Sequence, residues 1–312
     1  MGGALAALGL LTRCQWDDDS AYAPQRIGLY LRVDSALYWL PEGGSALRLP
    51  YAVRALAGTE KHLWALGTDG RTLWSFPAGS LEPNRSELLP YAVTTLASTA
   101  QELYAGGPSH IGQASLRGKS HHPELRWKWA PSPPVSALAA GSSFIGAAGD
   151  NRLLVLLPGE AQASFSATLS GPIDRLWVET PTALGGTFRG RDTLYPFRYE
   201  VRARWLQLDT TQPASYRKRL YSPYLQAQFG TEYLGVVSLS ARGELSPLGL
   251  ASVTEVEATF LDGKAFVLRQ DSVLEYDLHG ARPARLIGTF PGAQRLEVVP
   301  VFRYGSAEIT TR

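Results

Sequence analysis

The chain has 312 residues, of which 45% are hydrophobic and 19% charged, and this apolar fraction excludes a largely disordered protein. Its 30 basic and 28 acidic residues leave a formal net charge of +2, so the bulk charge gives no reason to expect a nucleic-acid partner. The 31 glycines and 21 prolines follow no fixed period, which excludes a collagen-like chain and indicates many turns.

The first element is an apolar run over residues 4–11, followed three residues later by the only cysteine, Cys14. This run is shorter than the ~20 residues that span a bilayer, but it has the length of the apolar part of a secretory signal. Residues 1–14 resemble a bacterial lipoprotein signal. The resemblance implies an exported protein, periplasmic or anchored at the outer membrane by a lipid on Cys14. A cytoplasmic protein that keeps its N-terminus is the alternative.

Residues 15–25 are polar and acidic, and we interpret them as a tether between the lipid and a folded domain over 26–312. Once Cys14 carries a lipid, the remaining chain contains no other cysteine. Disulfides and thiolate metal sites are therefore not expected. No cluster of metal ligands or cofactor motif stands out in the sequence, so we expect neither a metal nor a cofactor.

An internal repeat begins in the middle of the first hundred residues. The pentapeptide LPYAV at 49–53 recurs unchanged at 89–93, forty residues later. Related copies start at 135, 173, 224 and 253, with a last fragment from 295. Each copy contains three or four short apolar runs separated by turn residues such as Asp69-Gly70, which suit tight hairpins. The pattern predicts about four antiparallel strands in every ~40 residues.

This repeat resembles the blade of a β-propeller, and the resemblance covers residues 26–305 without indicating a subfamily. It implies an all-β fold with a single propeller of seven four-stranded blades. The segment 26–50 contains strand-like runs but lacks a first strand, which the fragment from 295 could supply. We therefore expect the N- and C-terminal strands to pair and close the ring, which removes open sheet edges.

The interval from Ile173 to Tyr224 is longer than the others, and it predicts an insertion near 190–220 that projects from the disc. Arginine and aromatic residues alternate in this stretch, and these residue types are enriched at protein interfaces. The alternation is also typical of an ordinary strand with one buried face. The residues we assign to partner binding are Arg198, Arg202, Arg204, Trp205, Tyr216, Arg217, Lys218 and Arg219.

No nucleophile, zinc or phosphate-binding motif of a known enzyme class is visible, and the catalytic residues, if any exist, are unknown. The function that the sequence favours is a non-catalytic, exported scaffold of the bacterial cell envelope. Its partner would be a protein or an envelope polymer. The alternative is a carbohydrate-active enzyme that uses arginines and carboxylates from several blades in the central funnel.

Overall fold

The computed structural model describes most of the chain between residues 24 and 302. The described ranges are 24–41, 45–59, 61–99, 101–116, 124–180, 182–214, 216–221, 236–240, 242–246, 248, 250–258, 264–277 and 283–302. Cys14, residues 15–23 of the expected tether, and the expected repeat start at Tyr224 lie outside these ranges.

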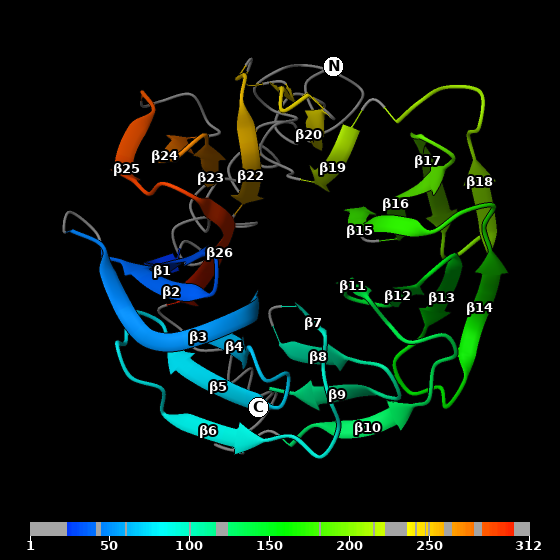
Figure 1. The fold of residues 1–312 in the computed structure, drawn as a ribbon, viewed down its shortest axis with the longest axis horizontal. Coiled ribbons are helices and arrows are strands. Elements are labelled where there is room, and N and C mark those ends of the chain that lie inside the picture. The colour runs from blue at the N-terminus through cyan, green and yellow to red at the C-terminus, as the bar shows by residue number, and fades with distance from the viewer. Residues whose placement is uncertain are drawn as a thin grey trace, which may run out of the picture.

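The described residues form antiparallel β-sheets and no helix, and the sheets stand around a common centre (Figure 1). The largest sheet contains, in spatial order, β26 (Ala293–Phe302), β1 (Pro24–Val33), β2 (Ala36–Leu40), β3 (Leu47–Gly58), β4 (His62–Gly67), β5 (Thr72–Pro77) and β6 (Arg85–Leu88). Three four-stranded sheets follow. The first contains β7 (Thr95–Ser98), β8 (Glu102–Gly106), β9 (Ile111–Ser115) and β10 (Arg126–Trp129), and the second contains β11 (Ala137–Ala140), β12 (Ile145–Gly149), β13 (Arg152–Leu156) and β14 (Ala163–Thr168). The third contains β15 (Ile173–Thr180), β16 (Ala183–Gly190), β17 (Thr193–Glu200) and β18 (Trp205–Leu208). The last two are β19 (Tyr216–Tyr221), β20 (Val236–Ser240) and β21 (Leu245–Ser246), and then β22 (Val253–Ala258), β23 (Lys264–Arg269), β24 (Ser272–Asp277) and β25 (Arg285–Thr289).

Strand β3 joins two sets of strands because its two halves pair with different neighbours. Its first half pairs with β2, in the register Leu37↔Leu49, and its second half pairs with β4, in the register Leu56↔Ala65. The two ends of the described chain also meet in this sheet, since β1 pairs with β26 along almost its whole length. Segments that are more than 260 residues apart in the sequence therefore lie side by side.

The innermost strands are β3, β7, β11, β15, β19, β22 and β26 (Figure 1). Close contacts link β3 to β7, β7 to β11, β11 to β15, β15 to β19, β22 to β26 and β26 to β3. An ion pair between Lys218 and Glu255 links β19 to β22. These strands thus surround the centre and position the side chains that line it.

A β-bulge recurs at the start of these inner strands. In five of these strands, one residue has no partner in the pairing with the neighbouring strand. It is the residue that follows Val53, Ile173, Tyr216, Val253 and Ala293. In β7 and β11 the preceding residues, Thr94 and Ser136, donate backbone hydrogen bonds of 2.8 Å to the carbonyls opposite Thr95 and Ala137. A bulge bends the strand and changes the direction of the extra side chain. The same device therefore operates where each inner strand enters the centre.

The hydrophobic core lies between neighbouring sheets. One cluster, for example, joins Leu66 and Leu73 of β4 and β5 to Leu96 and Leu103 of β7 and β8. Middle strands such as β12 are buried at every position, because both faces of the sheet are covered. Burying a leucine side chain contributes about 1.5–3 kcal/mol, so each sheet depends on its neighbours for its stability.

The described part of residues 190–220, where the sequence predicts an insertion, contains three strands. Residues 193–208 form β17 and β18 of a four-stranded sheet, and β19 starts at Tyr216, 43 residues after Ile173 and 37 before Val253. The long interval in the sequence arises because we placed a repeat start at Tyr224 instead of Tyr216. The extra length appears instead in β16 and β17, which have eight residues each, against five or six in the middle strands of the other four-stranded sheets.

Candidate functional site

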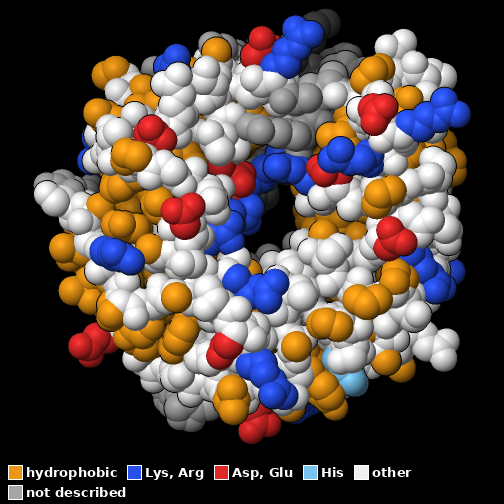
Figure 2. Space-filling model, viewed as in Figure 1, with side chains coloured by type: hydrophobic (Ala, Val, Ile, Leu, Met, Phe, Trp, Pro, Cys, Tyr) orange, Lys and Arg blue, Asp and Glu red, His pale blue; other side chains and the backbone are white. Residues whose placement is uncertain are grey.

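The centre of the molecule contains a cavity of about 650 Å³ lined by the inner strands. Figure 2 shows Lys and Arg side chains gathered around the central opening. Five cations and four carboxylates line the cavity: Arg32, Arg54, Arg175, Lys218, Arg295, Asp174, Glu255, Glu257 and Glu297. A volume of this size is within the range of small-molecule sites.

The cavity has two chemically different walls. We number each inner strand from the residue equivalent to Val53. The second and fourth residues after it are two apart, so their side chains share one face of the strand. On β3, β7 and β11 they are neutral: Ala55, Ala57, Thr95, Ala97, Ala137 and Ala139. On β15, β19, β22 and β26 the cavity-lining residues at these positions are large or charged: Arg175, Trp177, Lys218, Glu255, Glu257, Arg295 and Glu297. One wall of small side chains therefore faces one wall of charges.

Lys218 is held by the two carboxylates of β22. Its Nζ lies 2.6 Å from Oε1 of Glu255 and 2.6 Å from Oε1 of Glu257, and it donates a hydrogen bond to the carbonyl of Val256 at 2.8 Å. Burial alone would lower the pKa of Lys218, but the two carboxylates outweigh it and raise this pKa. Lys218 therefore stays charged and ties β19 to β22.

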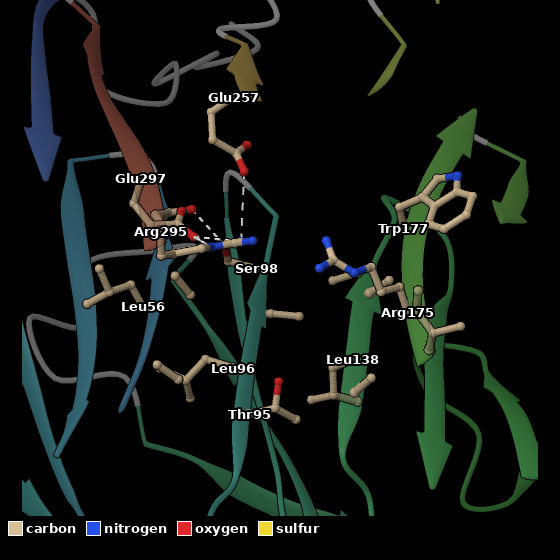
Figure 3. A pocket seen from close by; sticks show the side chains of 18 of the residues that line it. Leu56, Thr95, Leu96, Ser98, Leu138, Arg175, Trp177, Glu257, Arg295 and Glu297 are labelled. Atoms are coloured by element: carbon tan, nitrogen blue, oxygen red, sulfur yellow. Dashed lines mark hydrogen bonds and ion pairs between the residues drawn. The ribbon is translucent and has the colours of Figure 1, made fainter. Parts of the chain in front are cut away.

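Arg295 of β26 continues this network to the next strand. Its Nη1 lies 3.3 Å from Oε2 of Glu255, and its Nη2 lies 2.8 Å from Oε1 of Glu297 (Figure 3). The other oxygen of Glu297 accepts a hydrogen bond of 3.2 Å from the backbone N–H of Gly58 on β3. A continuous chain of polar contacts thus crosses from β19 through β22 and β26 to β3.

The environment moves the pKa values of two of these carboxyls in opposite directions. Burial raises the pKa of Glu297 to about 7, although the Arg295 guanidinium favours its ionised form. Burial also opposes ionisation of Glu255, but Lys218 and Arg295 outweigh it and hold its pKa at about 2. The two side chains are 8% and 9% exposed, so solvent screens them only weakly.

Arg32 of β1 and Arg54 of β3 also line the cavity, and Arg32 lies opposite Arg295 in the pairing of β1 with β26. Arg32 of β1 donates from Nη1 to the carbonyl of Arg54, and from Nη2 to Oε1 of Gln294 at 3.1 Å. Its Nε is buried and has no hydrogen-bond partner among the described residues. Burial and the neighbouring charge of Arg295 lower the pKa of Arg32, so its charged form is disfavoured there.

The structure separates the residues that the sequence groups as one partner-binding surface. Arg198 lies on β17, Arg202 and Arg204 lie in the turn after it, and Trp205 begins β18; we call these four residues the rim patch. All four are exposed, and Trp205 is 57% exposed at the outermost strand of its sheet. Lys218, in contrast, points into the central network. Tyr216, Arg217 and Arg219 belong to the same strand β19, and their side chains lie outside the described parts of the structure.

Sequence reasoning missed the charged wall of the cavity. A signal for it is present once the copies are aligned on the inner strands, because the second residue after the first position is Ala55, Thr95, Ala137, Arg175, Lys218, Glu255 or Arg295. A position that is small in three copies and charged in four others indicates a locally specialised surface rather than a common packing requirement.

Within the described ranges, no group of three histidine, cysteine or acidic side chains is arranged to hold a metal ion. The same ranges contain no helix with the length and apolar character of a membrane span.

Comparison with known proteins identifies the fold. No family model matches this chain, and no curated protein matches it. Among solved structures, the chain is similar to the β-propeller domain of Cps50 (Swd1) from Myceliophteria thermophila, with 12% identity over 80% of this chain and 93% of that one and a TM-score of 0.52. It is also similar to a protein from Lactobacillus plantarum (10% identity, 88% and 99% of the chains, TM-score 0.54) and to Kuenenia stuttgartiensis hydrazine synthase (9%, 72% and 76%, TM-score 0.51). The chain has an all-β, propeller fold, and at these identities the likeness extends to the fold alone.

Proposed function

We propose that this protein is a non-catalytic β-propeller that acts as an interaction scaffold for a protein or polymer of the cell envelope. The observation that carries the proposal is the rim patch, in which a tryptophan that is 57% exposed lies on the same hairpin as three exposed arginines. Arginine and tryptophan are the residue types that contribute most binding energy at protein interfaces. The backbone supports this role, since β18 is the outermost strand of its sheet and presents an edge to a partner.

The charges of the rim patch favour an acidic partner surface. Arg198 pairs with Glu200 at 3.3 Å, whereas Arg202 and Arg204 form no ion pair with any described residue. Leu208, at the other end of β18, is 44% exposed and extends the apolar part of the patch. A partner that places carboxylates over the turn and apolar side chains over β18 would complement this surface.

The test is capture of partners from the native host by the purified full chain. The variant Trp205→Ala combined with Arg202→Glu and Arg204→Glu should lose the partners that the parent protein retains. Leu88→Ala is the control, because Leu88 is an apolar side chain that is 72% exposed at the end of β6, the outermost strand of another sheet. Equal capture by the parent and the triple variant would refute a role for the rim patch.

We further propose seven blades, closed by the two ends of the chain. The seven inner strands support this number, as do the register shifts in β3, β15, β19, β22 and β26, with β3 divided between the last blade and the first. The pairing of β1 with β26 supports closure, because it makes one sheet from both ends of the described chain.

The location in the envelope rests on the sequence of residues 1–14, and we propose it on that basis alone. Mass spectrometry of the protein from its native host should find a lipid-modified Cys14 as the first residue. A retained Met1 with an unmodified Cys14 would instead support the cytoplasmic alternative.

A carbohydrate-active enzyme remains a second candidate because carboxylates and arginines from several strands do meet in the cavity. Carboxyls with pKa values shifted in opposite directions, such as Glu255 and Glu297, are found in acid–base pairs. Against this candidate, Oε1 of Glu297 accepts from Arg295 and its Oε2 from Gly58, so both oxygens already have partners. Turnover of glycans by the parent protein that is lost in Glu255→Gln and Glu297→Gln would establish the enzyme.

A further inference from the structure

The cations of the cavity differ in how well carboxylates neutralise them. Lys218 and Arg295 each contact two or more carboxylates at the charged wall. Arg32 and Arg54 form no ion pair with any described residue. Arg175, which is 47% exposed, has only its neighbour Asp174, at 3.6 Å, and this carboxylate is shared with Arg189, also at 3.6 Å. Among the described residues, these three arginines therefore lack the two carboxylate contacts that Lys218 and Arg295 each make.

The position of these arginines follows from the bulges. Arg54 is the extra residue of the bulge in β3, and Arg175 directly follows the extra residue of the bulge in β15. Both line the cavity, and Figure 3 shows Arg175 reaching into it from the side opposite Arg295 and Glu297. Bulges are common next to binding sites because they change where a side chain points.

The remaining surface between the arginines is neutral and partly apolar. Ala55, Ala97, Ala137 and Leu138 contribute to it, and none of them carries a side-chain polar atom that would compete for the guanidinium groups. Among the described residues of the lining, five cations outnumber four carboxylates, and Glu297, with its pKa of about 7, is only partly ionised at neutral pH. An anion with an apolar body would match the cationic and the apolar parts of this surface.

We propose that the central cavity is a binding site for an amphipathic carboxylate, with its charged end at Arg54 and Arg175 and its apolar part on the alanine-rich wall. A carboxylate fits the planar, two-pronged geometry of a guanidinium and gains charge-assisted hydrogen bonds.

The carboxylate can come from a free organic acid or from an acidic side chain of a partner protein. A partner's acidic side chain as the source rests on the proposed scaffold function, whereas a free organic acid is independent of that function. The two sources are distinguished by testing a free acid and a peptide separately, and neither test involves the rim patch. Failure of the cavity proposal is therefore distinguishable from failure of the scaffold proposal.

The experiment is calorimetric titration of the full chain with two pairs of probes. Octanoate is the free-acid probe, and octanol is its uncharged control. A blocked peptide with the sequence Ala-Leu-Glu-Leu-Ala is the second probe, and the same peptide with glutamine is its control. Arg54→Gln and Arg175→Gln are the test variants. Arg126→Gln is the matched control, since Arg126 is exposed on β10, the outermost strand of its sheet.

We expect at least one of the acidic probes to bind, and its affinity to fall about tenfold or more in each test variant but not in Arg126→Gln. Binding of the parent protein should also weaken as salt is added, a measurement that does not depend on any variant folding. Binding of octanoate alone assigns the site to free acids, and binding of the peptide alone assigns it to a partner segment. No binding of either acid, or equal binding of the acids and their uncharged controls, would overturn the proposal.

Discussion

At the scale of the residue, the decisive contacts are those of Glu255. This side chain receives Lys218 on one oxygen and Arg295 on the other, so one carboxylate joins three inner strands. Glu297, two residues after Arg295 on β26, is also buried. Its contact with Arg295 lowers its pKa by less than burial raises it. The two carboxyls therefore respond to pH in opposite ways.

We predict that Glu255→Gln destabilises the protein at pH 7 and that the difference from the parent shrinks at low pH. The folded state lowers the pKa of Glu255 from 4.5 to about 2, so its contribution is present above pH 4.5 and is lost as the pH falls toward 2. This shift corresponds to on the order of 3 kcal/mol at pH 7. Urea unfolding of parent and variant at pH 7 and pH 3 measures it. A difference that is the same at both pH values would contradict the prediction.

Glu297→Gln provides the contrasting prediction. The folded state raises the pKa of Glu297 from 4.5 to about 7, so the parent loses stability from this group as the pH rises between these values. The variant lacks the ionisable group, and its stability relative to the parent should increase from pH 5 to pH 8. The same urea titrations at these two pH values test the sign. A relative decrease over this range would show that Arg295 determines the ionisation of Glu297 more strongly than burial does.

At the scale of the element, close backbone contacts fix how one sheet passes to the next. The chain approaches Gly107, Gly149 and Gly171 so closely that an added Cβ would lie 1.9, 1.9 and 1.7 Å from the carbonyl oxygens of Ala92, Pro134 and Arg189. Each of these glycines lies near the turn or connection that leads into an inner strand. These glycines therefore allow the connection that leads into the inner strand to pass close to the end of the next strand of the same sheet.

We predict that Gly149→Ala destabilises the fold without removing any side-chain contact. The new Cβ would collide with the carbonyl of Pro134, which is backbone and cannot rotate away. The expected cost is about 1–3 kcal/mol, as for other overpacked sites. Thermal unfolding followed by circular dichroism measures the loss. An unchanged melting temperature would mean that the connection before β11 can shift freely.

At the scale of the whole molecule, stability depends on the meeting of distant segments. The β1–β26 pair extends from Pro24↔Phe302 to Val33↔Ala293, and one hydrophobic cluster joins these strands to Phe266 and Leu268 of β23. Closed propellers avoid exposed sheet edges by this means. Without β26, both β1 and the inner strand β22 would lose their neighbour.

We predict that deletion of residues 293–312 prevents formation of a stable monomer. The exposed edge of β1 would favour aggregation, and the cavity would lose Arg295 and Glu297 together. Deletion of 303–312 alone leaves β26 intact and serves as the control. Size-exclusion chromatography and thermal unfolding compare the two proteins. A monomeric, cooperatively folding product of the longer deletion would argue against closure by the chain ends.

The comparison of sequence and structure shows which features are local and which are not. The repeat at 53 and 93 is visible because inner strands bury the same apolar positions between sheets, as Leu56 and Leu96 do. The strand β19 was misplaced, and its sequence, YRKRLY, carries a cation where the copies from 53, 93 and 135 carry alanine or threonine. Lys218 is tolerated there only because Glu255 and Glu257 neutralise it, and these carboxylates are 37 and 39 residues away in the sequence.

The sequence by itself determined the all-β propeller fold, because turn residues and alternating apolar runs are short-range patterns that recur in every copy. It also indicated the arginines and the tryptophan of the rim patch, which are neighbours along one hairpin. Only the tertiary structure decided that Lys218 belongs to the centre and that Arg54 and Arg175 share a cavity. The reason is that the cavity is assembled from one or two side chains of each inner strand, and their proximity arises only when the sheets stand around a common axis.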